Sequence, residues 1–207
     1  IDFGFKPLVG IGNLVWIDND NNNIYSPNEG INGVLMELYK PGYGPDNIAG
    51  NADDDQVVQT TYTFNGGNGD GTYLFGDYPG TYIVKIPASQ FQLGGPLFAY
   101  TSLFGNGSDN QQDDNEDENG VNVGLPNVDG VESVPITLSV NGEILNEPGF
   151  PFFTGPFDGN IDFTIDFGFT LGCTLMATCT SQPQTICMPN DGSAATMVSG
   201  TRGNISY

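Results

Sequence analysis

Short apolar runs with a two-residue period recur along this 207-residue chain, and they constrain its fold more than any other feature. The clearest run covers residues 161–169, where Ile or Phe occupies every second position. Successive side chains of a β-strand point to opposite faces, so this pattern predicts strands with one buried and one solvated face. We expect eight strands, at residues 8–17, 33–40, 57–64, 72–75, 81–86, 97–103, 131–140 and 161–169.

Gly and Pro punctuate these runs, with 30 Gly and 14 Pro that follow no collagen-like period. No segment has a sustained helical period, and only residues 87–91 could form a single helical turn. Pro79 and Gly80 are expected to form a hairpin turn. Many short strands joined by turns predict an all-β fold, specifically an antiparallel β-sandwich with long acidic loops.

Residues 18–29 read DNDNNNIYSPNE and have the spacing of a calcium-binding loop. Oxygen donors occupy loop positions 1, 3, 5, 7, 9 and 12, namely Asp18, Asp20, Asn22, the backbone carbonyl of Ile24, Ser26 and Glu29. Position 6, usually Gly, is Asn23, which tolerates a left-handed backbone better than most residues. The alternative is a solvated Asn/Asp turn between strands. Glu at the twelfth position favours calcium, and the lack of nitrogen or sulfur donors argues against zinc or copper.

The charge of the chain excludes several classes of function. Four Lys and Arg against 25 Asp and Glu give a formal net charge of −21, and the chain has no His. This composition cannot displace counterions from phosphates, so we expect no nucleic-acid partner, and no apolar run is long enough for membrane insertion. Without His, neither a Ser-His-Asp nor a Cys-His arrangement can be built, so we expect no enzyme. Bound divalent cations would relieve the self-repulsion of such a domain.

Five sequence blocks, in order, carry a resemblance to a known family. They are IGNLVWIDNDNNNIYSPNEGINGVLMELY, GTYLFGDYPGTYIVKIPASQF, GGPLFAYTSLFGNGSDNQQDDNEDENGV, ITL and TIDFGF. Over about residues 9–169 the chain resembles the calcium-binding B-type (SdrD B-like) repeat of serine-aspartate repeat surface proteins. The resemblance implies an extracellular, prealbumin-like (Ig-like) β-sandwich with calcium as cofactor. It also implies service as a stalk or spacer in adhesins and other large surface proteins.

Two further acidic segments are candidate calcium ligands. The run from 109 to 119 contains six acids, and donors recur at two- and four-residue intervals at Asp109, Gln111, Asp113 and Asp117. The alternative is a flexible acidic loop, but these intervals and the family resemblance favour calcium. Three consecutive acids at 53–55 are a weaker candidate, in which at most two, such as Asp53 and Asp55, could share one ion.

The pentapeptide IDFGF occurs twice, at residues 1–5 and 165–169. Its second copy falls on the closing strand of the family-like region, so residues 1–7 are expected to be the closing strand of a preceding repeat or a linker. Residues 8–171 would then form the calcium-binding sandwich within a tandem array of like domains. The alternative is strand addition to a neighbouring copy, which would also link copies into a linear assembly.

The last segment, residues 172–207, differs in kind because acids nearly vanish and all three Cys occur there. The stretch CTLMATCTSQPQTICMPNDGSAATMVSGTRGNISY resembles the opening of SprB-type adhesin repeats, which implies a partial repeat or an interdomain or assembly segment. Cys173, Cys179 and Cys187 permit one disulfide and leave its pairing open. They lack the fourth ligand that a zinc site needs.

Two functions therefore remain in contention. The first is a calcium-stabilised spacer or extracellular filament subunit, and the second is an adhesin module that itself contacts a surface, host protein or glycan. The Pro- and Gly-rich loop EPGFPFFTGPFDG could separate them, because its aromatic residues would either form a contact patch or pack at a joint. These residues are Phe150, Phe152, Phe153 and Phe157.

Overall fold

The structure is a computed structural model in which two compact units are distinguished, Ile1–Thr170 and Leu171–Tyr207. It describes residues 4, 6–42, 56–66, 70–103, 119–122, 124–145, 158–172, 176–182 and 193–199. Among the segments of sequence interest, the second IDFGF copy lies within these ranges, whereas the Phe-rich loop and most of the first copy lie outside them.

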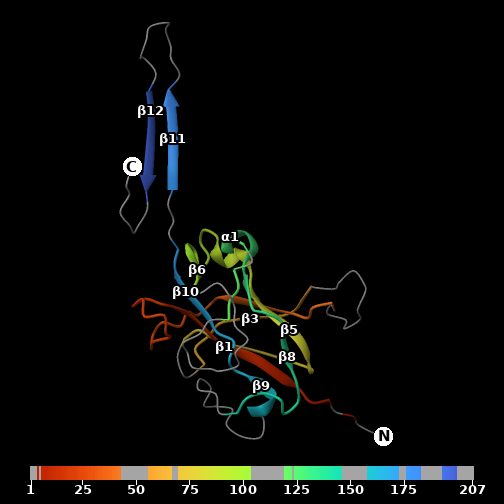
Figure 1. Ribbon diagram of the computed structural model, residues 1–207. Helices are drawn as coiled ribbons and strands as arrows, with labels where there is room; N and C mark the ends of the chain where they lie inside the picture. Colours follow the sequence, from red (N-terminus) through yellow and green to blue (C-terminus); the bar gives the residue numbers. More distant parts are fainter. Residues whose placement is uncertain are drawn as a thin grey trace. The chain divides into compact units, whose positions relative to one another are not determined.

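The first unit is a β-sandwich of two five-stranded sheets, which confirms the all-β fold class (Figure 1). One sheet contains β4 (Thr72–Asp77), β1 (Val9–Ile17), β10 (Phe167–Leu171) and β6 (Tyr100–Ser102) in that order, with β9 (Ile161–Asp162) also paired to β1. The other contains β3 (Val57–Tyr62), β2 (Leu35–Tyr39), β5 (Gly80–Ile86) and β7 (Val131–Glu132), with β8 (Ile136–Leu138) also paired to β5.

Apolar side chains from the inner faces of both sheets form one core. Ile11, Val15 and Phe167 come from the first sheet, and Met36 and Val84 come from the second. Alternation along β2 follows the sequence pattern, since every second residue is fully buried. Burying one such side chain contributes about 1.5–3 kcal/mol, so this shared core holds the two sheets together.

Most strand pairs are antiparallel, as predicted, but β1 pairs in parallel with β10 and with β9. The β10 ladder aligns Val15 with Phe167 and Ile17 with Phe169. The chain therefore enters the sheet along β1 and leaves it along β10 in the same direction. Entry and exit consequently lie at opposite ends of the sandwich.

Two long predicted strands are each divided. The run at 131–140 forms β7 and β8, separated by a segment with Pro135, which has no N–H for the ladder. The run at 161–169 forms β9 and β10, separated where Asp162 Oδ1 accepts hydrogen bonds from the N–H and the hydroxyl of Thr164. This local turn competes with regular strand pairing.

Three other predictions about the strands need correction. Pro79 and Gly80 do not form a hairpin turn, because β4 and β5 belong to different sheets. The strand expected at 97–103 is reduced to β6, since Ala99 takes a positive φ of 69°. The polar face of 161–169 is not solvated, because Asp162 and Asp166 are 2% and 1% exposed. The sequence period locates the strand but does not reveal that both of its faces are covered.

The short helical elements are the predicted turn, now η1 (Ala88–Phe91), together with α1 (Pro126–Asp129) and η3 (Asp158–Asn160). In the second unit, β11 (Met176–Gln182) and β12 (Ser193–Ser199) pair as an antiparallel hairpin. Cys179 lies on β11, whereas Cys173 and Cys187 lie outside the described residues. Within the described part of the chain, no helix has the length and apolar character needed to cross a membrane.

Candidate metal centre

The loop at residues 18–29 leaves the end of β1 and returns beside it. At its start, the Asp18 N–H donates a hydrogen bond of 2.8 Å to the Phe169 carbonyl on β10. At its end, the Ile17 N–H donates to the Glu29 carbonyl at 2.9 Å. Gly30, which follows, forms an antiparallel bridge with Trp16 of β1. The Asp70 carbonyl lies so close to Gly30 that a side chain at this position would collide with it. Both ends of the loop are thus fixed to the sheet.

Three carboxylates converge inside this loop. One oxygen from each of Asp18, Asp20 and Glu29 lies within 4.8 Å of the other two. Asp18 and Glu29 are only 5% and 7% exposed, whereas Asp20 is exposed. Calcium binds oxygen at 2.3–2.6 Å, so two ligands on opposite sides of one ion are about 5 Å apart. The three oxygens are therefore close enough together for all of them to contact one calcium ion.

The other predicted side-chain donors lie beside these carboxylates. Asn22 Nδ2 donates to Asp20 Oδ2 at 3.0 Å and to Ser26 Oγ at 3.2 Å. Ile24 follows directly, and its N–H donates to Asn22 Oδ1 at 2.7 Å. The structure therefore gathers the side chains of loop positions 1, 3, 5, 9 and 12 and places the position-7 residue next to them.

Backbone N–H groups already orient two of the carboxylates. Glu29 accepts from Asn19 N–H at 2.7 Å through Oε1 and from Ser26 N–H at 2.8 Å through Oε2. Asp18 accepts from the N–H groups of Asn22 and Asn23 at 3.1 and 3.2 Å. These hydrogen bonds fix the positions of the carboxylate oxygens within the loop.

The loop bends through left-handed residues. Asn21, Asn23 and Asn28 have φ values of 60°, 64° and 78°. Among residues other than Gly, Asn is one of those that adopt this conformation most readily. The prediction that Asn23 accommodates the turn at position 6 is therefore confirmed.

Further acidic groups surround the loop, and the sequence reasoning missed them. Burial, and then the negative charges of Asp70, Glu29 and Asp166, raise the pKa of the Tyr25 phenol. The Tyr25 ring packs edge-on against Trp16 of β1, with centroids 6.1 Å apart. Asp70 and Asp166 add to the negative potential that favours a cation there. The alternating pattern predicted that Asp166 lies on a solvated face of its strand, and Asp70 belongs to no local sequence motif that indicates a ligand.

The end of the second acidic segment is anchored in the core. Asn119 Oδ1 accepts from Asp166 N–H at 2.7 Å, and Asn119 N–H donates to the Asp166 carbonyl at 2.9 Å. Burial, and then the charges of Asp166 and Asp162, hold the pKa of Tyr73 well above its ordinary value. This anchor fixes where the acidic run rejoins the sandwich. The candidate ligands on either acidic segment lie outside the described residues: Asp109, Gln111, Asp113, Asp117, Asp53 and Asp55.

No protein-family model matches the chain, and no curated protein is significantly similar to it in sequence.

Proposed function

We propose that residues 18–29 bind one calcium ion and that the first unit is a calcium-stabilised structural module of a large secreted or cell-surface protein. In this proposal the module is a rigid spacer or filament subunit in a linear array, as the resemblance to B-type repeats implies. The observation that carries the proposal is the convergence of Asp18, Asp20 and Glu29, two of them buried, in a loop hydrogen-bonded to β1 and β10.

A cation changes the energetics of this loop. Two carboxylates about 4 Å apart repel by roughly 4 kcal/mol at an intermediate effective dielectric constant. A divalent ion between them replaces this repulsion with attraction and also takes the oxygens of Asn22, Ile24 and Ser26 into its shell. The backbone of Asp18 is hydrogen-bonded to that of Phe169, and the backbone of Glu29 to that of Ile17. An ion held by Asp18 and Glu29 would therefore tie the end of β1 to the closing strand.

The strand topology suits a spacer under tension. Force applied to the two ends of this unit would enter through β1 and leave through β10, which are adjacent and parallel. Pulling in opposite directions on two such strands loads their hydrogen bonds together in shear, and all must break before the strands separate. The calcium loop lies at the end of this ladder and would oppose the same sliding.

The chemistry of the site and of the chain favours the outside of the cell. Calcium outside the cell is roughly millimolar, so a site with a dissociation constant of about one micromolar would stay filled there. At a concentration a thousandfold above the dissociation constant, one ion stabilises the folded state by about 4 kcal/mol. The net charge of −21 makes such stabilisation valuable, since it offsets self-repulsion.

We assign no catalytic role to the module. The chain has no His, and the group of three carboxylates that converges within the described residues is that of the proposed ion site. The alternative function as a surface-binding adhesin module depends on the Phe-rich loop, which lies outside the described residues. No contact in the described part of the molecule favours it over the spacer.

Calorimetric titration of the full chain with calcium tests the ion site. Glu29→Gln should remove one binding equivalent of calcium. The substitution replaces one carboxylate oxygen by an amide nitrogen and removes the negative charge, while the size of the side chain stays the same. Asp77→Asn is the matched control, since Asp77 accepts a backbone N–H from Tyr78 at 2.7 Å but lies at the end of β4, opposite Val9 and away from the loop. Identical isotherms for Glu29→Gln and the unmodified chain would refute the assignment.

A further inference from the structure

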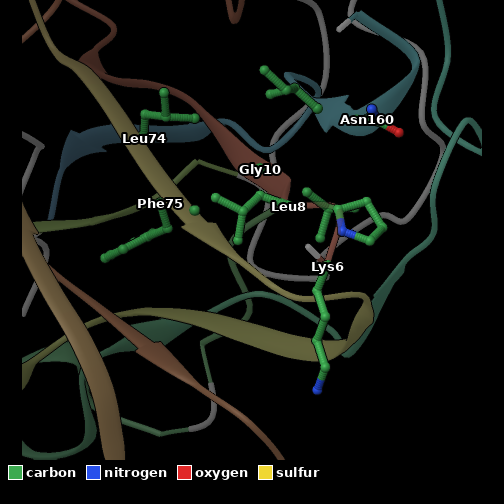
Figure 2. A pocket seen from close by; sticks show the side chains of 10 residues that line it. Lys6, Leu8, Gly10, Leu74, Phe75 and Asn160 are labelled. Atoms are coloured by element: carbon green, nitrogen blue, oxygen red, sulfur yellow. The ribbon is translucent and has the colours of Figure 1, made fainter. Parts of the chain in front are cut away.

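An apolar groove of about 650 Å³ lies where the chain enters β1 (Figure 2). Its walls come from the entry segment, from β4 and from β9. The apolar members are Pro7, Leu8, Val9, Leu74, Phe75 and Ile161. Leu8 is 61% exposed although it immediately precedes a buried strand, so an apolar side chain stands open to solvent beside an apolar groove. Such a surface indicates a docking site.

The opposite end of the same unit exposes a second apolar surface. Val9 lies eight residues before Ile17, which pairs with Phe169, so the entry groove is about 25 Å along the strands from the end of β10. Figure 1 shows α1 and β6 near the exit of β10, and β9 beside β1. Four large apolar side chains are exposed on α1 and on the segments flanking α1 and η1: Leu93, Phe98, Leu125 and Val128.

The repeated pentapeptide indicates what occupies the groove. In its second copy, the side chains of Ile165, Phe167 and Phe169 are fully buried in the core as the closing strand. The first copy, at 1–5, has the same apolar side chains and therefore the same need for burial. If it closes a preceding sandwich, only residues 6–8 join that sandwich to β1, and three extended residues span about 10 Å. The exit end of the preceding sandwich must then lie against the groove.

We propose that this groove is a socket for the exit end of a preceding module of the same kind, with Leu8 at the centre of the joint. The counterparts of Leu93, Phe98, Leu125 and Val128 on that module would cover it. A contact between two different surfaces of like modules propagates into a linear array instead of closing a dimer. The inference rests on the proposed spacer function and assigns the interface that would make the spacer stiff.

The charges and backbone at the joint agree with this arrangement. Modules with a net charge of −21 repel each other, yet Lys6, one of only four basic residues in the chain, lies at the groove. Asp129 lies on α1 at the exit end and offers the opposite charge. Pro7 fixes its own φ and restricts the residue before it, so the connection is stiff.

A two-module protein tests the socket directly. Residues 6–164 are placed before the full chain, so that residues 1–5 follow position 164 and become the closing strand of the added copy. ¹⁵N relaxation then reports whether the two sandwiches tumble as one body. Joint tumbling is expected in the two-module protein without substitutions. Replacing the Leu8 that lies at the junction between the modules, Leu8→Asp, should abolish it. Tyr62→Asp on β3 is the matched control, because Tyr62 is also 61% exposed but lies away from the groove.

Three results would overturn the socket. The added copy would remain unfolded if residues 1–5 do not serve as its closing strand. The two sandwiches of the unsubstituted two-module protein would tumble independently if the groove does not bind the exit end. Tyr62→Asp would loosen the pair as much as Leu8→Asp if the effect were merely one of added charge. Calcium titration of the single chain is a separate readout, so failure of the ion site and failure of the socket are distinguishable.

Discussion

The proposed calcium loop at 18–29 and the closing strand β10 are joined by a hydrogen bond, but they are held in place by different forces. In the loop, short-range contacts between Asn N–H groups and carboxylates organise a set of oxygens that repel one another. In the closing strand, Phe167 and Phe169 are fully buried between sheets by long-range contacts. We infer that the loop depends on an ion and the strand does not. Each of the following changes tests that difference.

The largest effect should come from the strand. Phe167→Ala removes a fully buried ring and leaves a cavity, so it should lower the free energy of unfolding by about 3–5 kcal/mol. The loss should be the same with calcium and with a chelator, because the side chain does not belong to the loop. Urea denaturation under both conditions measures it, and a loss confined to the calcium sample would contradict the proposed separation.

The return of the loop to the sheet should be the next most sensitive point. Gly30→Ala places a methyl group against the Asp70 carbonyl, and such overpacking costs about 1–3 kcal/mol. The shift should also displace Glu29 and weaken calcium binding. Gly76→Ala is the control, since its added Cβ would meet only the Val9 carbonyl at 3.9 Å. Equal calcium affinities for both variants would show that the anchor does not position Glu29.

Loop position 6 offers a smaller, stabilising change. Asn23→Gly should raise stability by up to about 1 kcal/mol, because Gly adopts a φ of 64° without steric cost. Asn19→Gly, at a loop position without a positive φ, should instead lower it slightly through the added freedom of the unfolded chain. Thermal melts of both variants in calcium give the comparison, and a destabilised Asn23→Gly would be evidence against strain at this residue.

The smallest effect concerns pH. Burial raises the pKa of Glu143, with a further increase from Asp162, although the hydrogen bond from Ser139 N–H opposes the shift. The folded state thus holds this proton more tightly than the unfolded state, so its contribution is fully present below the unfolded pKa and is lost as pH rises through the folded value. Calcium ligands behave in the opposite sense, since they must be deprotonated.

Comparing Glu143→Gln with the parent chain between pH 4 and 7, in chelator, isolates the Glu143 contribution. The difference in unfolding free energy should change in favour of the variant as pH rises. A difference that is flat across this range, or that changes in the opposite direction, would show that the folded protein does not raise the pKa of Glu143.

The sequence predicted those parts of the fold that depend on local pattern. The runs of strand-forming residues located β1, β2, β3, β4 and β5 to within two residues, with clear alternation in β2 and β5. It could not indicate that β10 runs parallel to β1, or that Asp162 and Asp166 are covered on the polar face, because these features depend on contacts between residues far apart in the sequence. The turn at Pro79 was misassigned for the same reason, since local chemistry does not specify which sheet the next strand joins.

The candidate site follows the same division. The sequence could predict that Asp18, Asp20, Asn22, Ser26 and Glu29 lie together, because the spacing of a calcium loop is a local pattern. It could not predict the same of Asp70 and Asp166, since they reach the loop only through the folded sandwich. The apolar groove had no sequence signal either, because its walls come from three separate segments.

The central claim is that calcium stabilises the folded first unit through the loop at 18–29. The most direct measurement is the melting temperature of the full chain in millimolar calcium and in excess chelator, repeated with Glu29→Gln. We expect a clear upward shift with calcium in the parent chain, corresponding to about 4 kcal/mol for a micromolar site, and a smaller shift in the variant. An unchanged midpoint in the parent chain, or an equal shift in Glu29→Gln, would contradict the claim.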